Sequence, residues 1–564
     1  MIVKTSTMRW PVFSVSRFAR PRNPRGIGGV LIKTCFVAVV YLWAFQASAQ
    51  QTYKAASCTQ TDVQTAINNE IAHAADGDII TIPTGTCTWT GSTPVTGNFT
   101  KSVTIQGAGA VSATTGGAGT TGTDQTVIIN HLPGTAPAMS FGTVAGKSFR
   151  VTGIAFLEDS GSLTQRYSGS LNVDGKSTAV RVDHCHFAMV VGGSKALRFG
   201  GSINGVADHI YITTTQAVTI AFVVENGATW GTDTGGYGNG SWADGDHFGT
   251  SQFMFIEDSR VQGGYWNDCS RGGRYVTRHS TMVGINSVEH GTHDQYRSCR
   301  ESEIYQNTVS GSPPGVYPMD GGALGTNGGT HLVWGNAVSG KKNIISIGYY
   351  RIDGATYGIS PAPPNGFGMC GTLHGPSSWD QNSSSNGYAC IDVPSRGQGD
   401  LLTNYVSAFS DIFNSTTGTR TSPRQARSPI YIWNNTLDNN GGNNMIGNTV
   451  PILTDNVDFY NQFGPSANSG SFNGTIGVGQ GSVAPTSAGA YTGAPNCTAG
   501  PGGNTPGVGW WNTSNNTLYV CTTTNTWTTY YTPYTYPHPL TQSSSSSSSA
   551  TTVAPPTGLS ATVQ

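Results

Sequence analysis

A loose pattern of apolar and polar positions recurs along the middle of the chain. In most copies an apolar residue comes first, a small or amide residue fourth and an apolar residue sixth. The clearest copies are VDHCHF (182–187), IEDSRV (256–261), TRHSTM (277–282), IYQNTV (304–309), VWGNAV (333–338) and IWNNTL (432–437), and ADHIYI (207–212) is a weaker one. Each unit is too short to bury a face by itself, so neighbouring units must stack.

The spacing of the copies predicts an all-β parallel solenoid. Their fourth positions are 25, 49, 21, 27, 29 and 99 residues apart. A unit of about 20–30 residues fits if 49 is two turns and 99 contains several turns or a large insertion. Equivalent positions would then form files with a spacing of about 4.8 Å. A sandwich of short strands is the alternative, but it would not repeat one residue type at one turn position as Asn307, Asn336 and Asn435 do.

The stretch before the repeats predicts a cap for the open end of such a solenoid. Residues 61–74, TDVQTAINNEIAHA, read as a helix in which Thr61 or Asp62 is the N-cap. Its apolar stripe contains Val63, Ala66, Ile67, Ile71 and Ala74. GDIITIPTGTCTW and KSVTIQGAG follow as the first strands.

This helix, GDIITIPTGTCTW, VTIQGAG and the VDHCHF-type units resemble the pectate-lyase-like superfamily of right-handed parallel β-helix proteins. The resemblance covers about residues 55–465. It implies a right-handed solenoid with an N-terminal capping helix. The superfamily includes polysaccharide lyases, glycoside hydrolases, phage tailspikes and non-catalytic surface proteins, so the resemblance does not choose among these functions.

Composition narrows the class of partner. The net charge is −1 and only 10% of residues are charged, so no basic field favours nucleic acid. A basic N-terminal region precedes CFVAVVYLWAF (35–45) and the QASAQ segment, which predicts a signal peptide over residues 1–49 and an exported protein. A membrane anchor is the alternative, but this apolar run is much shorter than the ~20 residues of a membrane span. We expect no stable membrane insertion after cleavage, and the oligomeric state is open.

Export permits disulfides. The expected pairs are Cys58 with Cys87, Cys370 with Cys390 and Cys497 with Cys521, and Cys269 with Cys299 is a further candidate. Cys185 is then an odd, buried thiol. The cysteines lack the C-x-x-C spacing of zinc sites, so they indicate no transition metal.

The composition also divides the chain. We expect the β-helix domain over 50–465, with an insertion at about 340–430, and an aromatic, disulfide-containing β appendage over 466–540. The appendage is expected to cap the C-terminal end, with an aromatic platform for sugar rings as the alternative. A Ser/Thr linker over 541–554 and the start of a truncated fibronectin type III domain over 555–564 follow.

The second position of each unit should point outward and form a wall. Its members are Asp183, Asp208, Glu257, Arg278, Tyr305, Trp334 and Trp433. Of these, Asp183, Asp208, Glu257 and Trp334 are the expected substrate-binding residues, together with Arg297. Asp183 and Asp208 would be only about 5 Å apart, which raises one pKa or favours a bound cation. This resembles the acidic wall where β-helix lyases hold calcium, so Ca²⁺ is the expected ion. Hydrogen bonds with a purely structural role are the alternative.

The scarce charges concentrate in RGGRYVTRHSTMVGINSVEHGTHDQYRSCRESEIYQNTV (271–309). A lyase must neutralise a uronate carboxylate, remove the C5 proton and protonate the leaving oxygen. We expect His290 as the base and Tyr296 as the acid. Arginines suit the carboxylate, and the candidates are Arg274, Arg278, Arg297 and Arg300. Salt bridges from Arg274 and Arg300 to Asp268, Glu301 and Glu303 are the structural alternative.

Hydrolysis would instead need two carboxyl groups on either side of the bond. Asp183/Asp208, Glu257/Asp258 and Asp268/Glu303 are the candidate pairs, and Asp244 and Asp246 in WADGDHFG are a further candidate for calcium. The Gly-His-Gly and Arg-Ile-Lys of polygalacturonases and the Arg-x-Pro-x-x-Arg of pectate lyases are missing. We therefore expect an exported polysaccharide-active protein, with a lyase for acidic glycans favoured over a hydrolase or a non-catalytic glycan-binding surface protein.

Overall fold

The computed structural model describes residues 50–542, which all belong to the compact unit Ser48–Gln564. Outside the described residues lie 74, 160–168, 217, 227–237, 292–296, 312–321, 349–391, 400, 402–412, 415–416, 418, 421–422, 424, 439–445, 449–452, 463–471, 486–496, 498 and 501–505. Among the described residues, no helix has the length and apolar character needed to span a bilayer.

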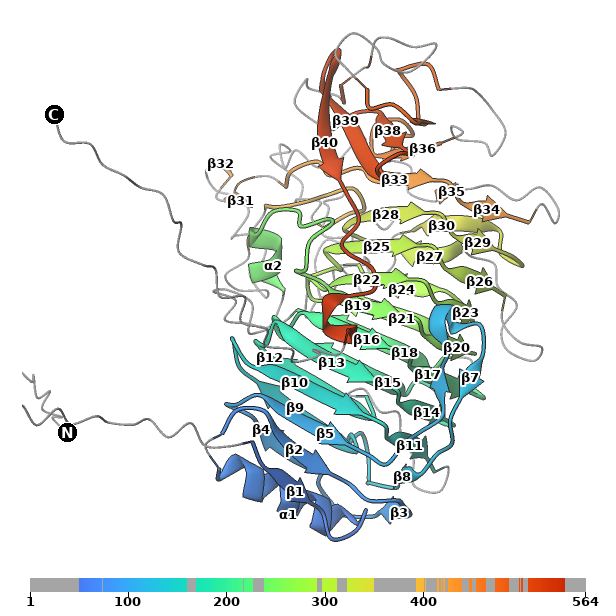
Figure 1. Cartoon of the computed structure of the whole chain (residues 1–564). Helices are drawn as coiled ribbons and strands as arrows, with labels where there is room; N and C mark the ends of the chain where they lie inside the picture. Colours follow the sequence, from blue (N-terminus) through green and yellow to red (C-terminus); the bar gives the residue numbers. More distant parts are fainter. Residues whose placement is uncertain are drawn as a thin grey trace, which may run out of the picture. The chain divides into compact units, whose positions relative to one another are not determined.

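Three parallel sheets, A, B and C, run through the unit, and the chain visits them in a fixed cycle (Figure 1). Sheet A contains β1 (Thr52–Lys54), β2 (Asp78–Thr81), β5 (Val103–Gln106), β10 (Ser148–Thr152), β13 (Ala179–Asp183), β16 (Gly205–Asp208), β19 (Met254–Glu257), β22 (Arg274–Arg278), β25 (Glu301–Tyr305), β28 (Thr330–Trp334), β33 (Ile430–Trp433) and β36 (Phe459–Asn461). Each strand pairs in parallel with the strand one turn later, so the predicted parallel β-helix is confirmed.

Sheet B contains β3 (Gly85–Trp89), β8 (Thr126–Asn130), β11 (Ala155–Glu158), β14 (His186–Met189), β17 (Tyr211–Thr214), β20 (Arg260–Gln262), β23 (Thr281–Val283), β26 (Thr308–Ser310), β29 (Ala337–Val338) and β34 (Thr436–Leu437). Sheet C contains β4 (Val95–Asn98), β9 (Met139–Thr143), β12 (Leu171–Gly175), β15 (Lys195–Gly200), β18 (Ile220–Glu225), β21 (Tyr265–Ser270), β24 (Ser287–Glu289), β27 (Gly322–Thr326), β30 (Asn343–Ile347) and β35 (Ile446–Asn448). The remaining elements are α1 (Gln60–Ile71), α2 (Asn239–Ala243), η1 (Thr115–Gly117), η4 (Pro539–Thr541), β6 (Ser112–Ala113), β7 (Thr120–Thr121), β31 (Phe413–Asn414), β32 (Thr419–Arg420), β37 (Val478–Gly481), β38 (Gly509–Asn512), β39 (Thr517–Thr523) and β40 (Thr526–Tyr531).

The strand register reproduces the predicted files. Asp183 pairs with Asp208, Asp208 with Glu257 and Glu257 with Arg278, and the file continues through Tyr305, Trp334 and Trp433. The interval of 49 residues is one turn with an insertion that contains α2, because β16 and β19 are neighbours. Its interpretation as two turns was wrong. The interval of 99 residues is likewise one turn, since β28 pairs with β33.

A left-handed residue makes the corner between sheets A and B in turn after turn. His184, His209, Asp258 and His279 have φ of 50°, 56°, 50° and 47°, and Gln306, Gly335 and Asn434 continue the series. A single residue in this conformation reverses the direction of the next strand sharply. The third position of the repeat therefore needs a residue that can adopt the left-handed conformation. The side chain of the fourth position points back toward the interior.

The amide ladder at the fourth position is confirmed. Asn336 Nδ2 donates to Asn435 Oδ1 at 2.9 Å, and Asn336 Oδ1 accepts from Asn307 Nδ2 at 3.0 Å and Asn307 N at 3.1 Å. These side chains are buried, so each bond satisfies a group that water cannot reach. Toward the N-terminus Ser280 and Ser259 replace asparagine, and Asn307 Oδ1 accepts from Ser280 N at 3.0 Å.

Replacing Asn336 with alanine should lower the unfolding free energy by about 2–4 kcal/mol. The change leaves buried donors of Asn307 and the Ile304 carbonyl without their partner, and each unsatisfied group costs about 1–3 kcal/mol. Denaturant unfolding measures the loss. Asn68→Ala, on the exposed side of α1, is the matched control and should change stability by less than about 0.5 kcal/mol. Equal effects of the two substitutions would contradict a role for the ladder.

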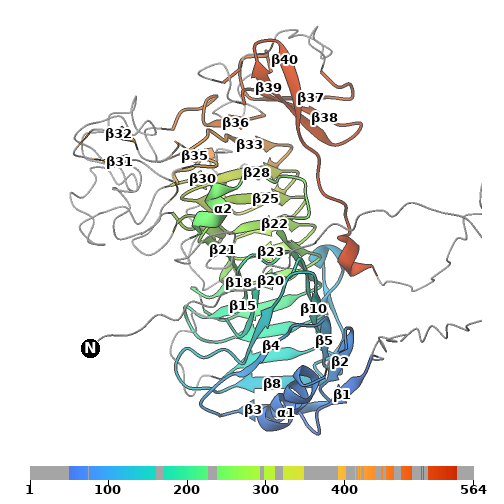
Figure 2. The same ribbon diagram turned by 90° about the vertical axis from the view of Figure 1, so that its left-hand side faces the viewer.

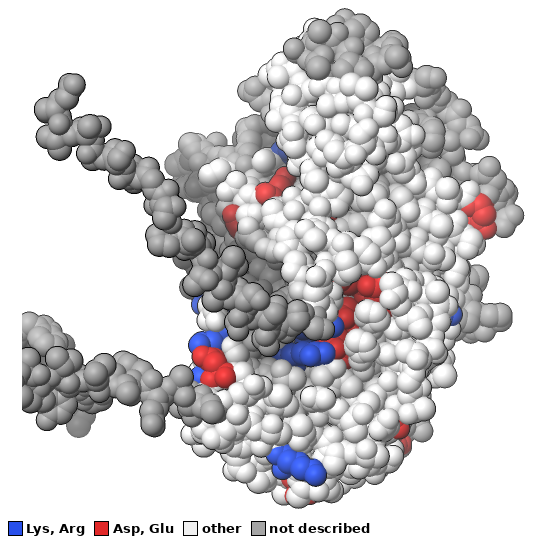
Figure 3. All heavy atoms as spheres, in the orientation of Figure 1, with Lys and Arg blue, Asp and Glu red and all other residues white. Residues whose placement is uncertain are grey.

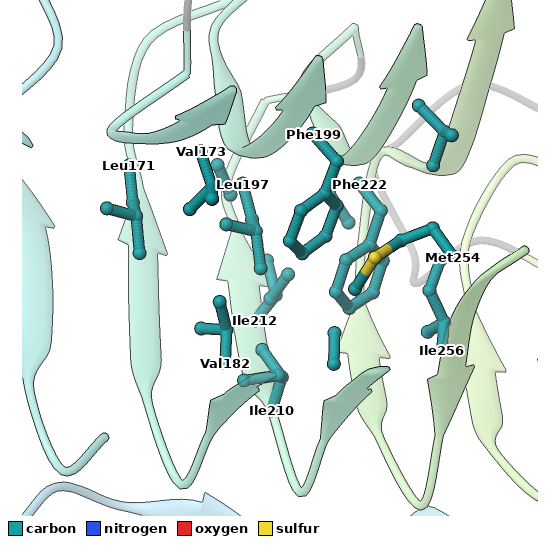
Figure 4. Close-up of a cluster of buried hydrophobic side chains, with 14 of the residues drawn as sticks. Leu171, Val173, Val182, Leu197, Phe199, Ile210, Ile212, Phe222, Met254 and Ile256 are labelled. Atoms are coloured by element: carbon teal, nitrogen blue, oxygen red, sulfur yellow. The ribbon is translucent and has the colours of Figure 1, made fainter. Parts of the chain in front are cut away.

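The solenoid interior is filled by apolar side chains from all three sheets. Figure 4 shows part of this core, where Leu171, Leu197 and Phe222 from sheet C face Val182 and Ile256 from sheet A. Leu171 pairs with Leu197 and Leu197 with Phe222, so one interior file runs through three turns. Stacking of like positions thus buries an apolar surface that no single turn could bury.

Helix α1 covers the β1 end of this core, as predicted (Figure 2). Its buried face contains Val63, Ala66 and Ile67, whereas Ile71 is 44% exposed and Ala74 lies outside the described residues. The N-cap is Thr59, which accepts from Asp62 N, and not Thr61 or Asp62. The N-cap therefore lies two or three residues earlier in the chain than predicted.

Three disulfides are present among the described residues. They join Cys58 to Cys87, Cys269 to Cys299 and Cys497 to Cys521, and Cys185 is the free, buried thiol. Cys370 and Cys390 lie outside the described residues. Three disulfides suggest an extracellular protein, because such bonds persist in oxidising compartments.

The C-terminal residues form a small mixed sheet, β37–β40, that packs against the outer face of sheet A. Trp511 contacts Trp334 and Trp433, with ring centroids 5.0 and 5.1 Å apart. The appendage therefore covers outward-facing aromatic side chains of sheet A. Beyond β40 the chain runs along sheet A to η4, which lies against β13 and β16 (Figure 1). We call residues 532–542 the C-terminal strap.

Candidate functional site

The acidic end of the predicted wall is fully paired. Asp183 accepts two hydrogen bonds from Arg150, at 2.6 and 2.7 Å, and Asp208 accepts two from Arg181, both at 2.9 Å. Both aspartates have buried side chains. Burial opposes ionisation of Asp183, but the bonds from Arg150 and His184 outweigh it and lower the pKa of this carboxyl. Arg181 also lies 3.3 Å from Asp183, so arginines neutralise both carboxylates and this pair does not fit the predicted calcium site.

The rest of the wall lies under the chain's own C-terminus. Arg278 donates to Glu257 at 2.8 Å and to the carbonyls of Tyr534 and Thr535 at 2.7 and 2.8 Å. Glu257 accepts from His538 N at 2.9 Å. Tyr305, Trp334 and Trp433 stack in register and are buried beneath β38–β40. Figure 3 shows how few charges remain visible on the face seen in Figure 1.

The other predicted arginines are also buried. Arg274 pairs with Glu301 at 3.0 Å and donates to Ser241 and Gly245, and Arg297 forms two bonds to Asp392 at 2.5 and 3.0 Å. Arg300 contacts Asp246 at 2.6 Å. The guanidinium groups of Arg297 and Arg300 both lie over Trp242 of α2. These arginines therefore form structural salt bridges, the alternative to binding a substrate carboxylate, and they attach inserted segments to sheet A.

Two buried glutamates of β25 have unusual pKa values. Burial raises the pKa of both Glu301 and Glu303 to about 7, against 4.5 ordinarily, although nearby arginines oppose the shift. Glu303 accepts from Gly249 N at 2.7 Å and from Tyr531 Oη at 2.8 Å. Glu301 accepts from His247 N at 3.2 Å. These carboxyl groups therefore hold the insertion after β18 and the C-terminal sheet onto sheet A.

The free energy of unfolding should fall as the pH rises from 4.5 to about 7. Below pH 4.5 Glu303 is protonated in the folded and unfolded states; between 4.5 and 7 only the unfolded state ionises, which favours unfolding. The loss should reach about 3 kcal/mol per carboxyl above pH 7. Denaturation midpoints at pH 5 and pH 8 test this for the wild type and Glu303→Gln. Glu303→Gln should lose less stability than the wild type between pH 5 and pH 8. If both proteins lose the same amount, Glu303 is not a source of the pH dependence.

His290 lies on the outer face of sheet C, beside Asp268. It follows β24, whose Val288 pairs with Asp268 of β21, so strand alternation puts both side chains on one face. His290 Nδ1 lies 2.6 Å from Asp268 Oδ1. The imidazole is 18% exposed, and its Nε2 has no hydrogen-bond partner among the described residues. A carboxylate at Nδ1 favours the tautomer whose Nε2 can accept a proton.

Three cationic side chains surround Glu225 on the same face. Arg198 lies 2.9 Å from Glu225, Lys195 3.7 Å and Arg271 3.9 Å, and Arg198 also contacts Asp174. Burial opposes ionisation of Glu225, but these cations outweigh it and lower the pKa of its carboxyl. Glu225 and Asp268 lie on neighbouring strands, two positions apart in register. We call Lys195, Arg198, Glu225, Asp268, Arg271 and His290 the sheet C cluster.

The structure therefore separates the predicted site residues. His290 belongs to the sheet C cluster, whereas Arg274, Arg278 and Arg300 are held by partners on sheet A, in the insertion after β18 and in the C-terminal strap. No hydrogen bond or ion pair joins these arginines to His290 among the described residues. Tyr296 lies outside the described residues.

The candidate carboxyl pairs for hydrolysis also have other partners. Asp268 and Glu303 lie on different sheets, and Asp258 accepts from Gly116 N and Tyr536 Oη. Asp244 contacts His247, and Asp246 contacts Arg300 and Ser428. None of these pairs forms an isolated couple of carboxyl groups in the described part of the chain.

Sequence reasoning missed Lys195, Arg198, Glu225 and Arg271. The signal was present in KALRFG, IAFVVE and YWNDCS, which are the sheet C strands of three successive turns. Their register is not readable from the sequence, because the connections before them vary in length.

Comparisons with protein-family models, with curated proteins and with solved structures found no match to this chain. The topology and the sheet C cluster together define a parallel β-helix protein with a polar, partly exposed site on one sheet.

Proposed function

We propose that this protein is an exported β-helix protein of the pectate-lyase-like superfamily that cleaves an acidic polysaccharide by β-elimination. The signal-peptide pattern before residue 50 and the three disulfides support export. The observation that carries the activity is the contact of His290 with Asp268 beside the cations of the sheet C cluster.

In the proposed reaction His290 Nε2 removes the C5 proton of a uronate residue. The electrons of that C–H bond form the C4–C5 double bond, the C4–O4 bond breaks, and the leaving oxygen takes a proton from water. We infer that Arg271, which is 34% exposed and 3.9 Å from Glu225, pairs with the substrate carboxylate, while Arg198 stays bound to Glu225 and Asp174. That pairing stabilises the charge that develops when the proton leaves. No step uses calcium, because the carboxylates of Asp183 and Asp208 are already occupied by arginines.

The test is incubation of the purified protein with uronate polymers, with and without EDTA. β-Elimination produces an ultraviolet absorbance from the new double bond conjugated to the carboxylate, together with new reducing ends. New reducing ends without this absorbance would indicate a glycoside hydrolase instead. Retention of the polymer without cleavage would indicate a non-catalytic glycan-binding surface protein. Activity that is present without EDTA and lost with EDTA would show a metal requirement that the reaction above does not include.

A further inference from the structure

Two histidines stack on successive turns at the corner between sheets A and B. His184 follows β13 and His209 follows β16, and both have the same left-handed backbone conformation. Their rings are 4.8 Å apart and within 5° of parallel. His184 is 46% and His209 23% exposed, so both imidazoles reach the surface.

Each of the two rings is held by a buried carboxylate. His184 Nδ1 lies 2.8 Å from Asp183 Oδ2, and His209 Nδ1 lies 2.9 Å from Asp208 Oδ2. Arg150 and Arg181 fix these carboxylates in turn. Neither Nε2 makes a hydrogen bond to any described residue. Histidines that bind metals characteristically donate their second ring nitrogen to a carboxylate, and here two neighbouring histidines share that arrangement.

We propose that His184 and His209 form a surface site for a divalent cation that prefers imidazole, such as Zn²⁺, Cu²⁺ or Ni²⁺. The ligand atoms offered by His184, His209 and Asp208 lie within 4.8 Å of one another. Asp208 orients His209 and is not a ligand, because both of its oxygens accept bonds from Arg181. Water completes the coordination at the exposed side.

Binding requires a small movement of the rings. Two nitrogens at the usual distance of about 2.0–2.1 Å from one tetrahedral ion are roughly 3.3 Å apart, so the parallel rings must tilt toward each other. Exposure of both imidazoles leaves room for this rotation about the Cβ–Cγ bonds. The site depends only on this corner and is independent of the proposed glycan chemistry on sheet C.

The test is titration of the purified protein with Cu²⁺ and Zn²⁺ by calorimetry, with electron paramagnetic resonance of the Cu²⁺ form. We expect one specific site and a spectrum with two imidazole nitrogens. His184→Gln and His209→Gln should each weaken binding by at least tenfold, since loss of even an orienting partner costs about 10–100-fold. Ca²⁺, which prefers oxygen ligands, should not compete.

His131→Gln is the matched control, because His131 also contacts a carboxylate through Nδ1 and is 32% exposed. It should leave the affinity and the spectrum unchanged. Circular dichroism shows whether each variant is folded. Absence of binding in the wild type would overturn the proposal, and so would affinities that are unchanged in both folded glutamine variants or a spectrum with one nitrogen ligand.

Discussion

Replacing His290 with alanine should reduce cleavage of a uronate polymer by about 10²–10⁴-fold, the usual contribution of a general base. The side chain lies 2.6 Å from Asp268 and has a partly exposed ring beside the cations around Glu225. Its loss removes the proposed proton acceptor, and His290 is not one of the side chains of the apolar core. Initial rates of ultraviolet absorbance for the wild type and the variant measure the effect.

Asp268→Asn separates positioning from proton transfer. The amide keeps the shape of the carboxylate but no longer favours the tautomer that leaves Nε2 free, so we expect a smaller loss of kcat with little change in KM. Polymer binding should survive in both variants, because Arg271 remains. The control is His131→Ala, which alters a histidine–carboxylate contact elsewhere. A His290→Ala variant with wild-type turnover would remove the base from the proposed mechanism.

Replacing Arg278 with alanine should lower the unfolding free energy by about 3–5 kcal/mol, the range for breaking a buried ion pair. Arg278 has no exposed surface, and its loss leaves the Glu257 carboxylate without its cation. The carbonyls of Tyr534 and Thr535 also lose their donors. Denaturant unfolding measures the stability, and limited proteolysis reports whether the C-terminal strap is more readily cleaved.

Lys147→Ala is the control for this substitution. Lys147 pairs with Asp76 at 2.6 Å, but 34% of Lys147 and 50% of Asp76 is exposed, so water screens the pair. Its loss should cost no more than about 1 kcal/mol. Comparable losses from Arg278→Ala and Lys147→Ala, or a strap that remains resistant to protease in the first variant, would contradict the proposed role of Arg278.

The columns of equivalent side chains at the sheet A corner were predictable, because each column depends only on contacts between neighbouring turns. Each unit contains its own strand, left-handed residue and inward residue, so aligning VDHCHF with IYQNTV already aligns Asp183 with Tyr305. The interval of 49 residues misled the count of turns, because an insertion and an extra turn lengthen the sequence in the same way. Only strand pairing distinguishes these two cases.

The candidate site was less predictable. Alternation showed that Glu257 and Arg278 point away from the core, but not that another segment lies on top of them. That segment is 256 residues further along the chain for Arg278, and its docking depends on hydrogen bonds to backbone carbonyls that any sequence offers. The sheet C cluster was hidden because the connections between sheets B and C vary in length.

The sequence by itself determined the coiling of the backbone, the capping helix, the amide ladder and the order of side chains in the sheet A file. These features follow from local periodicity and contacts between successive turns. The tertiary structure alone decided which outward side chains meet solvent. Packing of the C-terminal sheet and strap buried the predicted wall, whereas the face of sheet C with His290 and Asp268 stayed partly open. Burial depends on the segment that covers a residue, and no pattern within one turn contains that information.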